Sequence, residues 1–182
     1  MQRENPDFNQ YWYSPKTIRT IVDELRMIKP RRVACLSTPT VFFASCEAGL
    51  PCDLFEFDEQ FKSQTCVDEA TNLFIKFDYR DPTVAAALHH QYDVIVADPP
   101  FITEEVLRGY SIAASALLVT GGRILITSTA ENLELIRSLF SSSIHSVPFR
   151  PAIPSLVYQY DLFINYPLDT QSHLAHENGE LA

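Results

Sequence analysis

The sequence predicts a single α/β domain built on a seven-stranded, mostly parallel sheet. Short apolar runs alternate with helical segments between residues 14 and 140. Strands that are separated by helices pair in parallel, and the helices cover both faces of the sheet. The last two extended runs follow each other without a helix between them, which predicts a C-terminal antiparallel hairpin at or near one edge. The length of 182 residues is that of one domain, 1–182.

The first element is a helix in SPKTIRTIVDELRMIKP at 14–30. Ser14 is placed as its cap and Pro15 at the first helical position, and Pro30 closes it. Apolar residues recur between them at helical spacing, at Ile18, Ile21, Val22, Leu25 and Ile28. Residues 1–30 are therefore an N-terminal arm followed by a helix.

Strands and helices then alternate through a core at 31–167. We expect strands at 31–37, 52–58, 72–78, 92–98 and 121–129. We expect helices at 39–49, 81–91, 102–119 and 130–140. The hairpin strands are HSVPFRP at 145–151 and YQYDLFINYP at 158–167. The tail at 168–182 is polar, and we expect it to fray.

The composition of 46% hydrophobic and 20% charged residues is that of an ordinary soluble globule. No apolar run reaches the roughly 20 residues of a membrane helix, so we expect no membrane attachment. The start, MQRENPDFNQ, has no apolar segment after its positive charge, so we expect no secretory signal and a cytoplasmic location. The cysteines contain no CxxC pair, which favours reduced thiols over zinc or a disulfide, at Cys35, Cys46, Cys52 and Cys66.

The net charge of −9 disfavours a partner that is held through its phosphates. It favours a basic protein or peptide instead. The histidines at 89–90, 173 and 176 have no cysteine or acidic partners at ligand spacing, so we expect no metal.

Acidic residues follow three of the predicted parallel strands: Asp58, Asp78 and Asp98. Ligands of open α/β sheets bind outside the carboxyl ends of the strands. A single aspartate there is commonly a helix cap or a turn former. Three aspartates on one expected rim instead favour a ligand site.

Asp58 follows the end of the first strand by about 20 residues, the spacing at which an acid binds ribose hydroxyls in nucleotide-binding folds. The chain has only 5 glycines, none of them in the first turn, and it has no P-loop. The turn STPT at 37–40 offers hydroxyls and backbone N–H groups to a ligand without phosphate. These features favour S-adenosylmethionine, whose sulfonium cation suits an acidic, aromatic pocket.

DPPF at 98–101 resembles the D/N-P-P-F/Y/W motif of class I methyltransferases that act on nitrogen, which have a Rossmann-like fold. Within that superfamily, the chain resembles the lysine methyltransferases of elongation factor 1-alpha, formerly classed as adenine-specific DNA methyltransferase-like. The resembling segments, in chain order, are QYWYS at 10–14, CLSTPTVF at 35–42, FEFDEQF at 55–61, FDYRDP at 77–82, DVIVADPPF at 93–101, FRP at 149–151 and FINYP at 163–167. The missing GxGxG resembles this family's own serine-proline turn.

The resemblance implies roles for several residues around the cofactor. Ser37 and Thr38 anchor its amino acid end, Asp58 binds the ribose, and Asp78 with Tyr79 holds the adenine. Asp98 is expected to contact the cofactor as well. Two roles are open for the arm residues Trp12, Tyr13 and Ser14. They contact the cofactor, or they only fasten the arm to the domain.

The resemblance also implies how the target nitrogen is held. Asp98 and the carbonyl beside Pro99 accept hydrogen bonds from it, while Pro99 and Pro100 fix the backbone. Phe101 walls the entry channel. We expect Asp98 mainly to orient the nitrogen, with a general-base role or a simple strand-ending turn as the alternatives.

The resemblance therefore implies a protein-lysine methyltransferase with elongation factor 1-alpha as its substrate. Two alternatives stay open: an adenine-specific nucleic acid methyltransferase and a non-catalytic subunit that keeps the fold. The sequence lacks the basic extension that is typical of the first alternative, and it keeps the acidic residues that the second often loses. The oligomeric state, the target lysine and the number of methyl groups are open.

Overall fold

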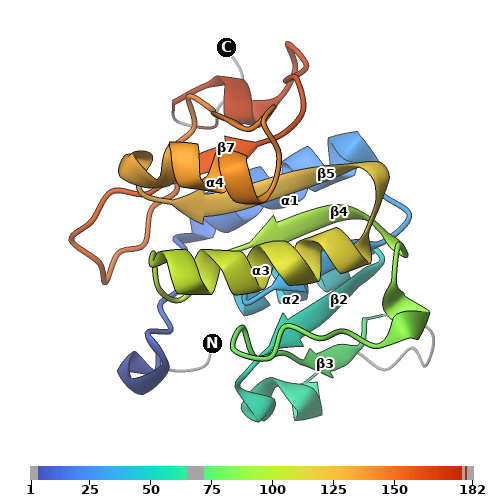
Figure 1. The fold of residues 1–182 in the computed structure, drawn as a ribbon. Coiled ribbons are helices and arrows are strands. Elements are labelled where there is room, and N and C mark those ends of the chain that lie inside the picture. Colours follow the sequence, from blue (N-terminus) through green and yellow to red (C-terminus); the bar gives the residue numbers. More distant parts are fainter. Residues whose placement is uncertain (1–3, 65–71, 178, 180–182) are drawn as a thin grey trace.

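The computed structural model describes residues 4–64, 72–177 and 179. They form one seven-stranded sheet in the order β3-β2-β1-β4-β5-β7-β6 (Figure 1). The strands are β1 Val33–Leu36, β2 Cys52–Glu56, β3 Phe74–Lys76, β4 Tyr92–Ala97, β5 Leu118–Ser128, β6 His145–Ser146 and β7 Asp161–Ile164. The first five are parallel, whereas β7 runs antiparallel to both β5 and β6. The predicted sheet and its C-terminal antiparallel strands are confirmed.

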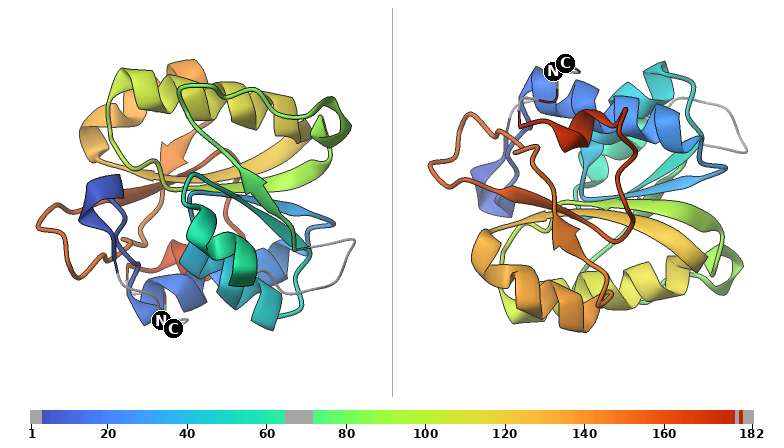
Figure 2. Two further views of the ribbon diagram at one scale, coloured as in Figure 1. Left: turned by 90° about the horizontal axis from the view of Figure 1, so that it is seen from below. Right: turned by 90° about the horizontal axis from the view of Figure 1, so that it is seen from above.

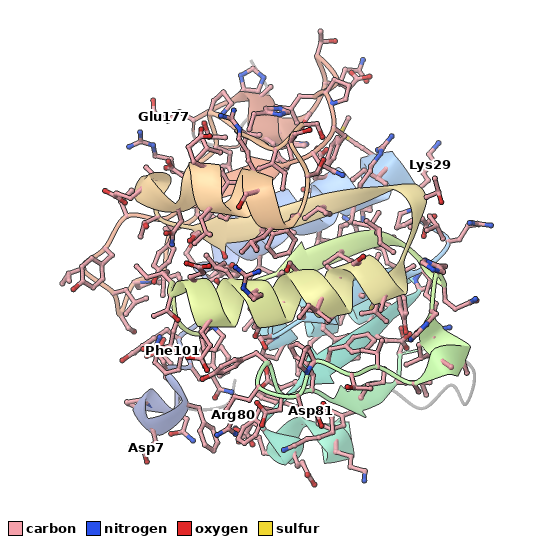
Figure 3. The ribbon with its side chains drawn as sticks, in the orientation of Figure 1. Asp7, Lys29, Arg80, Asp81, Phe101 and Glu177 are labelled. Carbon is pink, nitrogen blue, oxygen red and sulfur yellow. The ribbon has the colours of Figure 1, made fainter. Side chains whose placement is uncertain are left out.

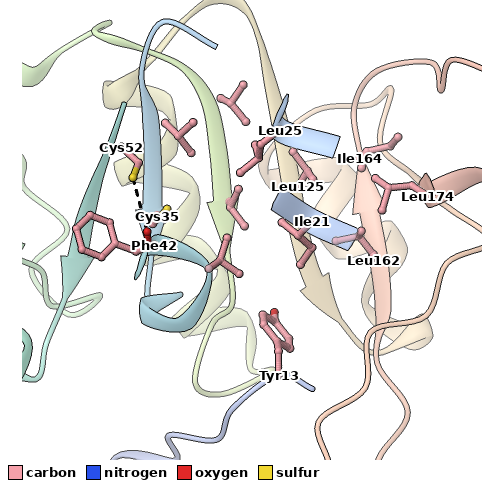
Figure 4. Close-up of a cluster of buried hydrophobic side chains, with 14 of the residues drawn as sticks. Tyr13, Ile21, Leu25, Cys35, Phe42, Cys52, Leu125, Leu162, Ile164 and Leu174 are labelled. Atoms are coloured by element: carbon pink, nitrogen blue, oxygen red, sulfur yellow. Dashed lines mark hydrogen bonds between the residues drawn. The ribbon is translucent and has the colours of Figure 1, made fainter. Parts of the chain in front are cut away.

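Two helices cover each face of the sheet (Figure 2). The helices α1 Pro15–Ile28 and α2 Pro39–Glu47 pack on one face, and α3 Glu104–Leu117 and α4 Leu133–Leu139 pack on the other. Each face has its own core of buried side chains. Figure 4 shows part of the first core, where Ile21 and Leu25 of α1 meet Leu125 of β5 and Ile164 of β7. In the same cluster, the Cys52 thiol lies 3.8 Å from the carbonyl oxygen of Phe42.

The order of strands reverses between β1 and β4, which lie side by side at the centre of the sheet. All residues of β1 and nearly all of β4 are buried, because helices cover them on both faces. The carboxyl ends of β1 and β4 therefore mark the point where the strand order reverses, which is the position at which such folds bind ligands.

The predicted helix at 81–91 is wrong. Within that range the structure forms only the 3-10 turn Ala86–Leu88. The three alanines of this segment, Ala85, Ala86 and Ala87, are exposed, whereas Val84 just before them is buried. A segment without an apolar stripe gains little from packing, and a helix this short is not stable by itself.

The C-terminal segment does not fray as expected over its described residues. It folds back on α1, where Leu174 is fully buried in the first core. The carboxylate of Glu24 on α1 accepts hydrogen bonds from Ser172 Oγ at 2.6 Å and from the Tyr166 hydroxyl at 3.0 Å. Leu174 and the Ser172 hydroxyl therefore fasten the tail to α1, and the Tyr166 hydroxyl, just before the tail, binds the same carboxylate.

Within the part of the chain that the structure describes, no helix has the length and apolar character that crossing a membrane requires. The same residues contain no cluster of metal-ligating side chains. The described cysteines Cys35, Cys46 and Cys52 form no disulfide, and Cys66 lies outside the described residues.

Candidate active site

A cavity of about 380 Å³ lies at the carboxyl ends of the central strands. It is lined by the N-terminal arm, the turns after β1, β2, β3 and β4, the middle of α3, and the loop between β6 and β7. Among the described residues that line it, four are acids, Asp7, Glu56, Asp78 and Asp98, and one is a cation, Arg80. The cavity thus favours a cationic ligand.

Asp98, directly after β4, is held in the cavity wall from two sides. Its backbone N–H donates to the carbonyl of Leu36 at 3.1 Å, which ties the turn to β1. Its carboxylate accepts a hydrogen bond from Thr127 Oγ1 of β5, and the Tyr13 hydroxyl lies 2.9 Å from the same Thr127 oxygen. Burial raises the pKa of Asp98 to about 6, although the hydrogen bonds from Thr127 and Tyr13 oppose that rise.

The rest of DPPF forms one wall and the mouth of the cavity. Pro99, Pro100 and Phe101 all line it, and 44% of Phe101 is exposed. Asn9 Nδ2 of the arm donates a hydrogen bond to the Pro100 carbonyl, so this carbonyl holds the arm in place. Figure 3 places Phe101 on the same side of the molecule as Asp7 and Arg80, which also line the cavity.

The arm residues divide between the two roles that the sequence left open. Trp12 lines the cavity and packs edge-on against Phe61, with ring centres 6.1 Å apart. Tyr13 is buried in the first core (Figure 4), and its hydroxyl lies 2.9 Å from Thr127 Oγ1. Ser14 Oγ accepts from the backbone N–H of Thr17 at 3.1 Å and so caps α1. Of the three, Trp12 is the one that faces a ligand directly.

The turn after β1 is shaped by Ser37, whose φ of 54° lies in the left-handed region. Its hydroxyl lies 2.5 Å from the Tyr110 hydroxyl of α3, which fixes an unusual conformation for a residue with a Cβ. Ser37 lines the cavity. Thr38 is buried beside it and does not line the cavity, and its Oγ1 has no hydrogen-bond partner among the described residues.

The acid that β2 presents to the cavity is Glu56, which the sequence reasoning missed. β2 ends at Glu56, two residues before Asp58. The carboxylate of Asp58 accepts from the backbone N–H of Gln60 at 3.0 Å, and the residue does not line the cavity. The buried Glu56 Oε1 accepts from the N–H groups of Phe57 and Asp58 at 2.8 and 3.0 Å. Burial raises the pKa of Glu56 to about 7.

The signal for Glu56 was present in FEFD, which carries two acids two residues apart. Residues at that spacing share one face of a strand, so either acid could have been the one at the strand end. The sequence alone placed the end of β2 two residues too late.

Asp78 and Tyr79 line the cavity beyond β3. Arg80 binds the carboxylate of Asp78 through two nitrogens, Nε at 2.9 Å and Nη2 at 2.7 Å, and this contact lowers the pKa of Asp78. The backbone of Tyr79 packs against Gly109 of α3. A Cβ at Gly109 would lie 2.2 Å from the Tyr79 carbonyl oxygen, so the close approach needs glycine.

Three further residues of the cavity were not singled out from the sequence. Gln10 lines it, and its buried Oε1 has no hydrogen-bond partner among the described residues. Tyr110 contributes its hydroxyl from α3. Tyr160 enters from the loop between β6 and β7, and burial together with the charge of Asp98 raises its pKa.

Comparisons with known proteins point to one family. Residues 4–168 match the family described as "Probable N6-adenine methyltransferase". The chain is 29% identical over 178 residues to a protein-lysine N-methyltransferase of Caenorhabditis elegans, covering 90% of this chain and 78% of that protein. It is 32% identical over 132 residues to the EEF1A lysine methyltransferase 1 of Danio rerio, covering 67% and 75%. Against the human EEF1A lysine methyltransferase 1 the identity is 31%, and the chain spans 59% of that protein.

Solved structures share the fold at low sequence identity. A branched-chain polyamine synthase from Thermus thermophilus, in complex with N4-aminopropylspermidine and 5'-methylthioadenosine, has a TM-score of 0.67 at 13% identity and covers 92% of this chain and 62% of its own. The glycopeptide N-methyltransferase MtfA has a TM-score of 0.57 at 14% identity, with coverage of 85% and 91%. The chain therefore belongs to the family of probable N6-adenine methyltransferases, class I enzymes whose methyl donor is S-adenosylmethionine.

Proposed function

We propose that this chain is an S-adenosylmethionine-dependent protein-lysine N-methyltransferase that acts on elongation factor 1-alpha. The observation that carries the proposal is the position of Asp98 in an acid-rich, aromatic cavity. Its carboxylate is buried, and Thr127 fixes its orientation from the neighbouring strand. Relatives with up to 34% identity are named as lysine methyltransferases of this factor, which supports both the reaction and the substrate.

The residues present suit the methyl donor. Ser37, which lines the cavity, would hold its amino acid end. Thr38 is buried beside it, outside the lining, so we no longer assign it a direct contact. Glu56 takes the ribose hydroxyls in our proposal, in place of the Asp58 that the sequence predicted, because Glu56 is the acid that lines the cavity. Asp78 and Tyr79 would hold the adenine. When bound, S-adenosylmethionine supplies a methyl group activated by a sulfonium.

Asp98 acts on the nitrogen that receives the methyl group. With a pKa of about 6 it is mostly ionised near neutral pH, so its oxygens accept hydrogen bonds from the nitrogen's protons. The carbonyl of Pro99 accepts beside it, and the lone pair is then directed along the line of transfer. The neutral amine would then take the methyl group from the sulfonium, whose S–C bond would break as the N–C bond formed, and the product would be a methylated ammonium.

A general-base role for Asp98 is less well supported than an orienting role. A lysine amine has an ordinary pKa near 10.4, roughly four units above that of Asp98. A base so much weaker than the amine takes the proton inefficiently. We therefore assign Asp98 the orientation of the nitrogen, with loss of the ammonium proton to water before methyl transfer.

Two alternatives are weaker on the same observations. An adenine-specific enzyme would bind a polyanion, yet the described lining of the cavity carries four acids and one arginine, which is already paired with Asp78. A non-catalytic subunit would not need the buried acids Glu56 and Asp98, whose burial costs free energy. A cytoplasmic location fits this substrate. We also propose that the arm, core and tail work as one domain.

The test supplies a labelled methyl donor to the purified chain, with elongation factor 1-alpha, RNA and DNA in parallel. Label is expected in the protein and should be lost with Asp98→Asn, which keeps the shape and removes the charge. Asp23→Asn is the matched control, because Asp23 lies exposed on α1 and pairs with Arg26. Label found only in nucleic acid would contradict the proposal.

A further inference from the structure

Exposed apolar side chains gather at the mouth of the cavity. Of the nine large hydrophobic residues that are exposed in the described chain, six line the cavity or belong to segments that line it. They are Phe8, Phe57, Phe101, Ile102, Val157 and Tyr158. Single exposed apolar residues are ordinary on a protein surface, whereas a group of them around one opening marks a binding surface.

The loop between β6 and β7 holds the two most exposed of these side chains. Val157 is 94% exposed and Tyr158 is 69% exposed. The loop lies at the same end of the molecule as the arm and the start of α3 (Figures 1 and 2). On either side of this tip, Leu156 and Tyr160 turn inward and line the cavity.

The base of this loop is fixed to the arm and to its own turn. Ser155 Oγ donates to the Glu4 carboxylate at 2.7 Å, and the Leu156 N–H donates to the Ile153 carbonyl at 3.0 Å. An anchored base with an apolar tip is a pre-organised contact, because little conformational freedom is lost when a partner covers it.

The charge around the opening indicates what covers it. Glu104 and Glu105 begin α3 after Phe101, Ile102 and the capping Thr103; Glu104 pairs with Arg108, and Glu105 is exposed. Asp7 is exposed on the arm side of the cavity. A second copy of this chain, at net charge −9, would be repelled from such a rim, and so would a nucleic acid. A basic segment of a protein would be attracted.

We propose that Val157 and Tyr158, together with Phe101 and Ile102, form the docking surface for the substrate segment that carries the target lysine. An apolar residue next to that lysine covers this surface, and basic neighbours face the acids at the start of α3 and on the arm. The inference rests on the proposed function, since it takes the substrate to be a protein.

A crosslinking experiment tests the surface without relying on methyl transfer. A photoreactive benzoylphenylalanine replaces Tyr158 in one protein and Ile112 in another, because Ile112 is 51% exposed on α3 and does not line the cavity. With purified elongation factor 1-alpha, crosslinks are expected from position 158 and not from position 112. Crosslinks from both positions, from neither, to a second copy of the chain, or to an added oligonucleotide would overturn the proposal.

Kinetics then separate docking from chemistry. The double variant Val157→Ser with Tyr158→Ser should raise KM for the protein substrate on the order of tenfold, with kcat and cofactor affinity close to those of the wild type. Ile112→Ser should change none of them. An unchanged KM in the double variant would also overturn the docking surface. Crosslinking at position 158 without any methyl transfer would instead contradict the proposed activity and leave the docking surface standing.

Discussion

Among single residues, Glu56 shows the conflict between binding and stability most clearly. Its carboxyl is buried, and its pKa of about 7 lies above the ordinary value of 4.5. The folded state holds this proton more tightly than the unfolded state does. The free energy of unfolding is therefore highest below about pH 4, and it falls as the pH rises towards the pKa of Glu56 in the folded state. Ionised Glu56 therefore destabilises the fold above neutral pH.

Glu56→Gln should consequently stabilise the protein. The amide oxygen can still accept from the N–H groups of Phe57 and Asp58, and the charge is gone. We expect its advantage in free energy of unfolding to grow by up to about 3 kcal/mol between about pH 4 and pH 8. Urea unfolding at several pH values measures it. Glu59→Gln, at an exposed residue paired with Lys76, should show no such trend.

Glu56→Gln should also weaken cofactor binding, because a neutral amide holds the two ribose hydroxyls less well than a carboxylate does. Calorimetric titration with S-adenosylhomocysteine should give a clearly higher Kd for Glu56→Gln, and a smaller change for Asp58→Asn. If Asp58→Asn raised the Kd more than Glu56→Gln did, the ribose contact would instead belong to Asp58.

Thr127 is predicted to act through Asp98. Thr127→Val removes the hydrogen bond that lowers the pKa of Asp98, so that pKa should rise further. We expect kcat to fall on the order of a hundredfold as the carboxylate loses its orientation. The acid limb of the pH–rate profile should move to higher pH. Thr127→Ser keeps the hydroxyl and should restore both, whereas a fall in kcat without a shift of the limb would indicate a packing effect alone.

At the scale of whole elements, the contact of α3 with the turn after β3 sets the width of the cavity. Gly109→Ala tests it, because alanine in the middle of a helix usually stabilises by up to about 1 kcal/mol. Here the added Cβ would meet the Tyr79 carbonyl oxygen at 2.2 Å, so one element must shift. We expect a loss of about 1–3 kcal/mol and weaker cofactor binding, measured by thermal unfolding and calorimetry.

Gly121→Ala is the control for this variant. Gly121 has a φ of 76° and no atom within 4 Å of an added Cβ, so alanine there is strained without a clash. It should lower stability by roughly 1–2 kcal/mol and leave cofactor affinity unchanged. A stabilised Gly109→Ala variant would contradict the close packing of α3 on Tyr79.

Elements with strong local signals were predicted well from the sequence. The Ser14 cap and Pro15 locate α1, and the apolar runs locate β1 and β4. The prediction failed where local pattern and packing disagree: the alanines at 85–87 look helical, but they offer the sheet no apolar face. The end of β2 was misjudged for a related reason, since alternation alone does not say which acid of FEFD leaves the sheet first.

At the scale of the whole molecule, the chain ends were the hardest parts to predict, because distant residues hold them. The arm is fixed through Asn9 to Pro100 and through Tyr13 to Thr127, and the tail through Ser172 to Glu24. Helix and strand patterns relate residues a few positions apart, whereas these partners lie about 90 or more positions apart in the sequence. The arm contacts bring arm residues into the lining of the cavity, so the complete lining could not be predicted from the sequence.

The overall charge leads to the last prediction. A chain of net charge −9 with an acid-rimmed cavity attracts a basic substrate over distances that salt controls. The screening length is about 8 Å at physiological ionic strength and about 3 Å at 1 M. Raising the salt should therefore lower kcat/KM for the protein substrate on the order of tenfold, mainly through slower association.

Cofactor affinity is the internal control for this effect. S-adenosylmethionine is small and binds inside the cavity, where added salt screens charges less than it does at the exposed rim. Its Kd should change much less than kcat/KM across the same salt series. Glu104→Gln with Glu105→Gln should flatten the salt dependence of kcat/KM, because these two acids lie beside the docking surface. If the slope is the same in that variant as in the wild type, the rim acids do not guide the substrate, and the attraction comes from the net charge as a whole.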